Sequence, residues 1–475
     1  MSTGPLAALA ALVAGSLIGE RLGAGSGTLL VAAGVVGLVL AWCTAGGARV
    51  ACAALAFASL GCGTMQRAVD GQVHHAWADA VERRDDVTVE GTLASDPSGG
   101  RFRVEAYVRA RGVDRTLLVR GASDDANRLR ALEAGDRVVL QGRLAPLVDA
   151  SPYHRRARQR HAVAVLDGAH LLSFAPAGEP LAALANAFRD VVTRGSESMP
   201  PTARALARGF VLGDTRGVPD DVADAYRDSG LAHLLAVSGQ NVAFALALVG
   251  PLLRRLPLAG RSVLALLTVL VFATATRFEP SVVRAGALAA VTILATFAGR
   301  PTARVRALVV AVIAVLLVDP FLVHSVGFRL SVAASAGIVV LAGPIAARLR
   351  GPRAVREAFA VSCAAQAGVA PVLLLTFGEL PLLAPVANLL AAPAAEALGV
   401  VALPALLAAG VVAPLGPVVA PVATALVGWV TLVACAGAAV PLTVDRTQAL
   451  VLVGLGAVAT LARRARRTVP APASR

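Results

Sequence analysis

The apolar residues of this chain lie in long runs that are separated by short charged loops. A run that approaches or exceeds about 18 residues can cross the hydrocarbon core of a bilayer as a helix. Three such runs open the chain, at residues 5–19, 22–48 and 50–66, and others follow from Leu231 onward. The first has no basic residue ahead of it, so we expect a retained span rather than a cleaved signal peptide. The pattern predicts an α-helical polytopic membrane protein with about 11 to 12 spans.

Residues 76–175 have a different character, with frequent charges and alternating apolar and polar positions. Such alternation is typical of β-strands that bury one face. A helical pattern at residues 124–133, with Leu129 and Leu132 on one face, separates the third strand from the fourth. Five strands with a helix after the third predict a small all-β OB-like domain, although other small barrels share this order. The predicted strands are residues 87–93, 101–108, 115–120, 136–143 and 161–166.

The remaining segments complete the predicted organisation. Residues 181–230 contain two amphipathic stretches, with Phe188 on the apolar face of one and Phe210 on that of the other, and we expect interfacial helices. Residues 380–395 are short and rich in proline, which favours a broken or re-entrant segment. Residues 397–444 carry no charge and can cross the membrane twice. The predicted regions are three N-terminal spans (1–66), the OB-like domain (76–175), the interfacial helices (181–230), a main membrane domain (231–463) and a basic tail (464–475).

The placement of arginine predicts the orientation of the spans. The formal net charge is +14, and the sequence contains no lysine. Loops with several arginines alternate with loops that have few, and basic residues are enriched in cytoplasmic loops. We therefore expect both termini in the cytoplasm and the OB-like domain outside. The arginine-rich loops contain Arg254, Arg255 and Arg261; Arg300, Arg304 and Arg306; Arg348, Arg350, Arg353 and Arg356; and Arg463, Arg464, Arg466 and Arg467.

Several kinds of chemistry are excluded or disfavoured by composition. All five cysteines lie in apolar runs, so the OB-like domain has neither a disulfide framework nor a thiolate metal site. Without lysine the chain cannot complete a Gly-x-x-x-x-Gly-Lys phosphate-binding loop. We expect no metal, no cofactor and no enzymatic activity. A hydrolytic site is a weaker alternative, because loop carboxylates are usually solvated; the available ones are Asp85, Asp86, Asp124 and Asp125.

Polar residues inside the apolar runs mark candidate functional positions, because a charged side chain at the bilayer centre costs about 2.5 to 3.5 kcal/mol. Residues 238–241, Ser-Gly-Gln-Asn, interrupt one run near its middle and are expected to face a wet cavity or another helix. Arg284 lies at the outer end of another span, and Arg329 and Ser331 enter a third. Hydrogen bonding within a kinked helix bundle and snorkelling of terminal arginines are the alternative explanations. Asp214 precedes these runs and can cap the turn that follows it.

In order and spacing, these motifs resemble the ComEC family of bacterial DNA-uptake channels over most of the chain. Many relatives also carry a metallo-β-lactamase-like domain, but the seven histidines here include no His-x-His-x-Asp-His cluster. The family usually has Ser-Gly-x-His where this chain has Gln240 and Asn241 after Ser-Gly, so an amide replaces an imidazole. The resemblance rests on Gly213-Asp214, the stretch from His233 to Gly239, Pro280-Ser281 with Arg284, Gly327-Phe328 with Leu330-Ser331, and Phe377-Gly378 leading to Asn388-Leu389.

The resemblance implies a pore that passes one strand of DNA across the bacterial cell membrane into the cytoplasm during natural transformation. The expected partners are single-stranded DNA, membrane lipid, cytoplasmic DNA-translocating and strand-protecting proteins, and possible help from a separate nuclease. The expected channel-lining residues are His233, Ser238, Gly239, Gln240, Asn241, Arg284, Arg329, Ser331 and Asn388. The expected structural motif residues are Gly213, Asp214, Pro280, Ser281, Gly327 and Phe328.

The OB-like domain is a candidate entrance for the strand, because OB barrels bind single strands through a basic groove and stacking aromatics. Aromatic residues are few here, so we expect a weak guiding contact, and a solvated arginine face is the alternative. A secondary transporter of a small solute would explain residues 238–241 equally well but would leave the OB-like domain without a role. The candidate DNA-binding residues are Arg143, Arg155, Arg156, Arg158 and Arg160.

Overall fold

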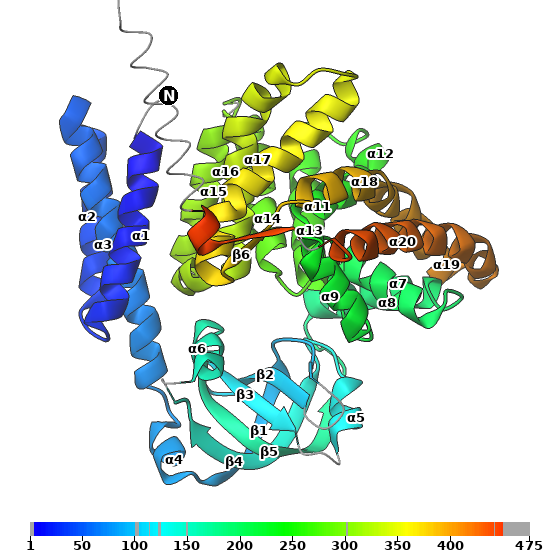
Figure 1. Ribbon diagram of the computed structural model, residues 1–475. Helices are drawn as coiled ribbons and strands as arrows, with labels where there is room; N and C mark the ends of the chain where they lie inside the picture. The colour runs from blue at the N-terminus through cyan, green and yellow to red at the C-terminus, as the bar shows by residue number, and fades with distance from the viewer. Residues whose placement is uncertain are drawn as a thin grey trace, which may run out of the picture. The chain divides into compact units, whose positions relative to one another are not determined.

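The computed structural model describes residues 4–99, 104–113, 115–121, 125–148, 151–300, 303–440 and 442–449. The chain divides into two compact units. The first unit comprises Met1–Val218, His233–Val332 and Ala394–Gly428, and the second comprises Pro219–Ala232, Ala333–Pro393 and Trp429–Arg475. Figure 1 shows the elements along the chain.

The N-terminal apolar runs form helices that pack closely in the first unit. Helix α3 (Gly46–Val73) contacts both α1 (Gly4–Leu22) and α2 (Gly27–Cys43). A Cβ atom on Gly63 of α3 would lie 2.8 Å from the backbone nitrogen of Val31, so the two helix backbones approach closely. Small residues at helix contacts allow this packing in membranes, where lipid removes the hydrophobic drive for association.

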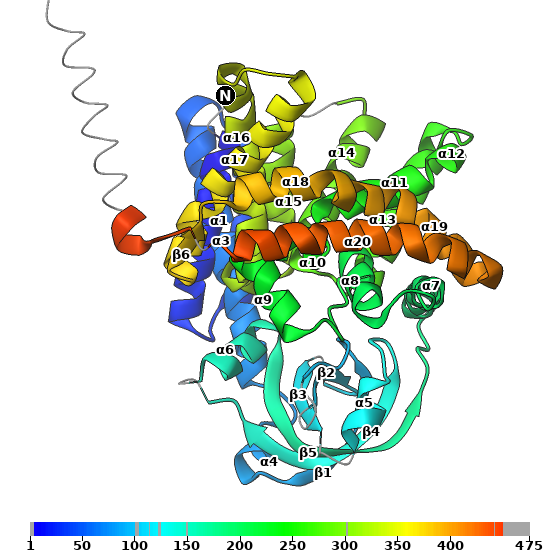
Figure 2. The ribbon, with the colours of Figure 1, turned by 45° about the vertical axis from the view of Figure 1, so that its right-hand side comes forward.

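The described residues from Asp86 to Ala175 form the predicted five-stranded β domain. Its strands close into a barrel in the order β1-β2-β3-β5-β4, in which β1 pairs with both β2 and β4 and β3 runs parallel to β5. Leu140, Leu144 and Leu166 are completely buried in its core. Figure 2 shows the curved path of the longer strands. The strands are β1 (Asp86–Leu93), β2 (Val104–Ala110), β3 (Thr116–Gly121), β4 (Arg137–Pro146) and β5 (Ala162–Ala175).

Short helices complete the barrel. The helix predicted after the third strand is α5 (Ala126–Arg130), and Leu129 and Leu132 are both buried, as their spacing suggested. Helix α4 (Ala78–Arg83) precedes the first strand. The sequence did not predict α6 (Pro152–Gln159), which lies between β4 and β5 and begins at a Ser151 cap. The last strand is longer than predicted, since its residues 162–169 pair with β3 and its residues 164–175 pair with β4.

Mostly helical structure follows the barrel, as the apolar pattern predicted. The elements are α7 (Pro180–Gly195), α8 (Pro201–Leu212), α9 (Asp220–Asp228), α10 (Ala232–Leu235), α11 (Gly239–Leu248), α12 (Gly250–Leu253), α13 (Leu258–Ala275), α14 (Pro280–Phe297), α15 (Arg304–Val318), η2 (Pro320–His324), α16 (Val326–Arg348), α17 (Arg353–Thr376), β6 (Glu379–Pro381), α18 (Ala384–Ala397), η3 (Leu398–Ala402), α19 (Leu403–Val411), η4 (Ala413–Leu415), α20 (Gly416–Ala438) and β7 (Thr443–Asp445).

Within the described residues, eight helices are long and apolar enough to cross a membrane, which confirms a polytopic membrane protein. Gly27–Cys43 and Ala232–Leu248 are shorter apolar helices. The predicted basic tail lies outside the described residues. The eight candidates are Gly4–Leu22, Gly46–Val73, Leu258–Ala275, Pro280–Phe297, Val326–Arg348, Arg353–Thr376, Ala384–Val411 and Ala413–Ala438.

The proline-rich segment at residues 380–395 differs in detail from the sequence prediction. Leu380 lies in β6, opposite Val444 of β7, and α18 then continues through the π-helical turn η3 into α19. Ala384–Val411 therefore forms one apolar helix of 28 residues, so the first of the two expected crossings already begins in this segment. Pro393 removes a backbone donor within the helix. The break appears as an irregular turn after the proline rather than as a separate re-entrant element.

Candidate functional site

The polar stretch at residues 238–241 forms the start of a helix rather than the middle of one. Helix α10 ends at Leu235, and α11 begins at Gly239. Ser238 occupies the N-cap position with extended backbone angles, φ −83° and ψ 158°. The polar residues therefore lie at a helix start, although the Ser238 side chain forms no cap hydrogen bond there.

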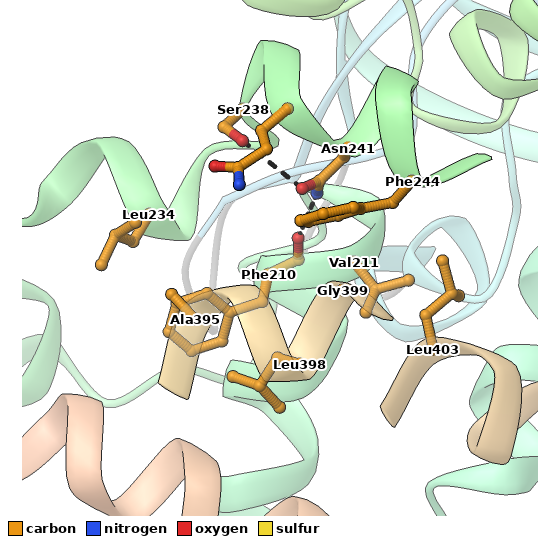
Figure 3. Close-up of a pocket in the computed structure, with 11 residues that line it drawn as sticks. Phe210, Val211, Leu234, Ser238, Asn241, Phe244, Ala395, Leu398, Gly399 and Leu403 are labelled. Carbon is orange, nitrogen blue, oxygen red and sulfur yellow. Dashed lines mark hydrogen bonds between the residues drawn. The ribbon is translucent and has the colours of Figure 1, made fainter. Parts of the chain in front are cut away.

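Asn241 ties α11 to α8. Its side-chain Nδ2 donates a hydrogen bond of 2.6 Å to the carbonyl oxygen of Phe210, and Ser238 Oγ donates a long bond of 3.4 Å to Asn241 Oδ1 (Figure 3). Phe244 lies against Gly399, so α11 also contacts the π-helical turn. This polar contact occurs inside an otherwise apolar group of helices.

A cavity of about 40 Å³ lies beside these side chains. A cavity needs roughly 10 to 15 Å³ of such space to hold one water, so this cavity has room for a few waters and not for a nucleotide. The lining residues are Phe210, Val211, Leu234, Ser238, Gln240, Asn241, Phe244, Ala395, Leu398, Gly399 and Leu403 (Figure 3).

A second polar group surrounds the same helix break from the side of α14 and α16. Ser281 Oγ donates a hydrogen bond to the carbonyl oxygen of Val237. Arg284 Nε donates a bond of 2.7 Å to Ser331 Oγ. Its guanidinium also lies against Gly239, because a Cβ atom there would be only 2.6 Å from Arg284 Nη2. We call Val237, Gly239, Ser281, Arg284 and Ser331 the helix-break cluster. Three motifs that are far apart in the sequence meet in it.

Some expected motif residues support this arrangement from outside the cluster. A Cβ atom on Gly327 would lie 3.5 Å from the ring of Pro280, so a small residue lets the start of α16 approach α14. Phe328 is buried in an apolar group with Leu12 and Leu316. Gly213 adopts a left-handed backbone with φ 73°, which favours glycine, and it ends α8 beside Val237.

Other expected channel-lining residues lie elsewhere. His233 on α10 and Arg329 on α16 are exposed. Asn388 belongs to the second unit, where its Nδ2 donates a hydrogen bond of 2.6 Å to Ser362 Oγ of α17. The structure therefore unites Gly239, Ser281, Arg284 and Ser331, whereas Asn388 belongs to the other unit.

A buried group of charges joins the barrel to the helices, and the sequence did not reveal it. The side chains of Arg189 and Asp214 are each 2% exposed. Arg189 Nη2 lies 2.8 Å from Asp96 Oδ2 of the barrel and 3.4 Å from Asp214 Oδ2. We call the whole group the junction cluster: Asp96, Glu133, Arg189, Arg208, Asp214, Arg216 and Arg277.

Asp214 does more than cap a turn. Its Oδ1 accepts a hydrogen bond from the backbone nitrogen of Arg216, as a turn cap does, and the same side chain is also ion-paired with Arg208 and Arg216. Burial alone would raise the pKa of Asp214, but its bonds to Arg216 and the charges of the other arginines hold it well below the usual value of 3.8. Burial raises the pKa of Glu133 and lowers that of Arg277. One clue was present in the sequence, since Arg189 adjoins the apolar face of α7.

The basic residues of the barrel do not form one uniform surface. Arg155 and Arg156 are exposed on α6, whereas Arg158 Nη2 donates to the carbonyl oxygen of Leu147. Arg143 Nε donates to the carbonyl oxygen of Arg84. The guanidinium of Arg160 lies over the ring of Tyr107, at 5.3 Å from its centroid.

Helix α6 covers part of the outer face of the barrel. Its Ala157 is fully buried in an apolar group with Leu118 and Val165. The guanidinium of Arg120 on β3 lies 5.0 Å from the ring centroid of Tyr153, which belongs to α6. OB barrels use the face of their second and third strands to stack nucleic-acid bases. Here the tyrosines near that face are already covered by arginines.

These features define a class of protein: a polytopic helical membrane protein with an inserted β-barrel and a polar cluster at a broken helix. A family model described as "Competence protein" matches residues 210–467, which is more than half of the chain. The chain therefore belongs to the Competence protein family, the ComEC family that its motifs indicated.

Two curated relatives match parts of the chain. ComE operon protein 3 of Bacillus subtilis (strain 168) is 27% identical over 207 residues, which cover 43% of this chain and 26% of the relative. Uncharacterized protein YcaI of Escherichia coli (strain K12) is 28% identical over 148 residues, which cover 28% of this chain and 19% of the relative. The chain thus matches about a quarter or less of the length of each relative. No solved structure matches the chain.

Proposed function

We propose that this chain forms the membrane path along which one strand of DNA enters the cytoplasm during natural transformation. Membership of the Competence protein family supports this function. The observation that carries the proposal is the helix-break cluster, in which residues from α11, α14 and α16 gather around one broken helix. Polar groups among membrane helices are costly, so their convergence favours a solute pathway.

The chemistry of this cluster suits a polyanion. A strand carries one negative charge per phosphate and needs an aqueous, cationic route through hydrocarbon. The Arg284 guanidinium donates to the neutral hydroxyl of Ser331, and within the described residues it forms no ion pair. Its positive charge can therefore interact with a passing phosphate. The start of α11 adds N–H donors and the positive end of a helix dipole beside it.

The proposed path must open before a strand can pass. The cavity beside Asn241 holds about 40 Å³, far below the several hundred Å³ of ordinary ligand pockets. Widening it requires α11 to move away from α8, which breaks the bond between Asn241 and the carbonyl oxygen of Phe210. Under this proposal the barrel lies outside the cytoplasmic membrane, both termini lie inside, and cytoplasmic proteins pull on and protect the strand. A separate nuclease would supply the single strand.

The primary test is deletion of the gene in a transformable host. We expect the deletion to abolish uptake of DNA into the cytoplasm while duplex DNA still binds to the cell surface. Complementation with the intact chain should restore uptake, and a block of alanines at residues 238–241 should not. A deletion strain that transforms normally would refute the proposal and favour transport of a small solute.

A second test asks whether water reaches the broken helix. In a chain whose native cysteines are replaced, Gln240→Cys should react with a membrane-impermeant thiol reagent, because Gln240 is exposed and lines the cavity. Leu267→Cys on α13 is the matched control, since Leu267 is 49% exposed but lies on an apolar candidate span. Equal protection of both cysteines would count against an aqueous route at this point.

A further inference from the structure

A second cavity lies within the first unit, where the barrel meets the helices. It has a volume of about 170 Å³, roughly four times that of the cavity beside Asn241. The barrel contributes the end of β1, Arg109 of β2 and the turn before β4, and the helices contribute the start of α7 and the end of α13. The residues that matter for its chemistry are Thr92, Arg109, Glu179, Thr274, Arg277 and Phe278.

The loop that forms one wall has an unusual backbone. Arg277 and Phe278 both adopt left-handed conformations, with φ of 56° and 54°. This region is unfavourable for residues with a Cβ atom, and bulky residues rarely adopt it. Such strain persists only where surrounding contacts enforce it, and it concentrates at functional sites.

One contact within the junction cluster and two contacts with neighbouring residues hold this backbone. Arg277 Nε donates to Asp96 Oδ1 and Arg277 Nη1 donates to Asn186 Oδ1, each at 2.8 Å. The backbone nitrogen of Phe278 donates to the carbonyl oxygen of Ala273 at 2.7 Å. As a result Phe278 stays 53% exposed beside the cavity, although phenylalanine is usually buried.

The cavity combines an aromatic ring with a cation and hydroxyl groups. Arg109 is exposed, whereas Arg277 is largely neutralised by Asp96, and Glu179 adds one negative charge. Proteins that bind single strands without sequence preference stack bases on aromatic rings and place basic residues along the backbone. Phe278 and Arg109 supply one of each. The tyrosines of the barrel are less available, because Arg160 and Arg120 already cover their rings.

The cavity also connects to the helix-break cluster through one element. Phe278 lies two residues before the start of α14, and Ser281 and Arg284 lie within the first turns of that helix. With a rise of about 1.5 Å per residue, Arg284 is only about 6 Å along the helix from Pro280. A group bound beside Phe278 would therefore be close to the proposed path.

We propose that this cavity is the entrance site for one base of the incoming strand, which stacks on Phe278 while its phosphate stays outside the cavity and pairs with the exposed Arg109. This inference rests on the proposed function and assigns the first contact of the strand to the junction between barrel and helices. The site takes unpaired bases, because a base within a duplex is already stacked on its neighbours and cannot cover the ring.

The test measures binding of a fluorescent thymine-only oligonucleotide to the purified full-length chain in detergent. Phe278→Ala should weaken binding roughly tenfold, the range found for loss of one stacking ring, while Phe278→Tyr should bind normally. Phe297→Ala is the matched control, because Phe297 lies at the far end of α14 with a similar exposure of 51%. Unlabelled duplex of the same length should compete poorly.

A salt titration tests the phosphate contact. Arg109→Gln should reduce the slope of log affinity against log salt by about 0.7, the value for one phosphate contact with a single strand. Arg111→Gln is the control, since Arg111 lies two positions after Arg109, is exposed and pairs with Glu90. An unchanged slope in Arg109→Gln would remove the phosphate from the assignment.

Three results would overturn the site. One is the absence of measurable oligonucleotide binding by the intact chain, and another is equal binding by Phe278→Ala and Phe297→Ala. The third is that Phe278→Ala weakens association with phosphatidylglycerol nanodiscs but leaves oligonucleotide binding unchanged. The ring would then be a membrane anchor. If the gene deletion blocks transformation while Phe278→Ala binds normally, the entrance site fails and the proposed path stands. If Phe278→Ala weakens binding but the deletion strain transforms normally, the entrance site stands and the proposed path fails.

Discussion

The junction cluster and the helix-break cluster both hold arginine away from bulk water, but only the junction cluster surrounds it with carboxylates. Arg189 is 2% exposed and lies within ion-pair distance of Asp96, Glu133 and Asp214. Arg284 instead donates to the hydroxyl of Ser331, and the described residues provide no carboxylate partner for it. The junction cluster sets three carboxylates against four arginines, whereas the helix-break cluster contains an arginine and no carboxylate.

This difference separates a scaffold from a site. Ion pairs buried in a protein contribute little net stability. Removing one partner leaves the other charge buried and uncompensated, which costs several kcal/mol. An uncompensated cation has the opposite property, because its removal relieves a desolvation cost. We infer that the junction cluster fixes the barrel to the helices, while Arg284 is retained for a negatively charged ligand. Substitutions can test the two roles separately.

The largest expected effect comes from breaking the junction cluster. Asp214→Asn should lower the free energy of unfolding by about 3 to 5 kcal/mol, because Arg189 would then be buried with less compensation. Thermal unfolding of the purified chain in detergent measures this change. Asp224→Asn is the control, since Asp224 is 58% exposed and pairs with Arg227 at the surface, where a pair is worth about 1 kcal/mol or less. Similar losses in both variants would contradict a structural role for the cluster.

The pH dependence of stability should carry the signature of the same carboxylate. The folded pKa of Asp214 lies below its ordinary value of 3.8, so its contribution is present above pH 3.8 and is lost as the pH falls below that value. The expected slope is at most about 1.4 kcal/mol per pH unit for one proton. Unfolding temperatures of the intact chain should therefore fall below this pH, and those of Asp214→Asn should fall less steeply.

Glu133 should give the opposite dependence in a different window. Burial raises its folded pKa above 4.5, so its protonated form is favoured on folding and stability decreases as the pH rises from 4.5 through the folded pKa. Glu133→Gln should flatten the curve in this upper window and leave the acidic window unchanged. A Glu133→Gln variant that alters only the acidic window would contradict the raised pKa of Glu133.

The main elements of the fold could be predicted because their signals are local. Apolar runs and strand alternation each depend on neighbouring residues, and the N-terminal helices and the barrel strands occur close to the expected positions. The helix between β4 and β5 was missed, since its eight residues include three arginines and only short apolar side chains apart from Tyr153. Its burial comes from Ala157, and alanine gives a weak hydrophobic signal.

The sites were predictable only in part. Ser281, Arg284 and Ser331 could be singled out individually because polar groups are costly among apolar spans, but their meeting at Gly239 depends on helix packing. The junction cluster has a weaker signal in the sequence. Asp96 lies in a charged domain where a carboxylate is ordinary, and its partner Arg189 is 93 positions away. No local pattern relates two such residues.

Replacement of Arg284 should affect uptake more than stability. Arg284→Gln should reduce transformation by roughly tenfold or more, equivalent to at least about 1.4 kcal/mol, while its unfolding temperature stays the same or rises. Arg284→Lys keeps the charge and should retain most of the uptake. Arg350→Gln, at an exposed loop arginine, is the control. If Arg284→Gln instead destabilises the chain as Asp214→Asn does, the contrast between the two clusters is wrong.

The smallest effects should come from the amide contact beside the small cavity, and their order is informative. Asn241→Ala removes a 2.6 Å bond and leaves the carbonyl oxygen of Phe210 without this donor, so stability should fall by about 1 to 2 kcal/mol. Ser238→Ala removes only a long bond of 3.4 Å and should cost less than about 0.5 kcal/mol. Thermal unfolding compares the two, and thiol labelling of Gln240→Cys in each background reports the opening of the cavity. We expect Gln240→Cys to be labelled faster with Asn241→Ala alone, because the Asn241 bond holds α11 against α8. Faster labelling with Ser238→Ala alone would instead show that Ser238, at the start of α11, keeps the cavity closed.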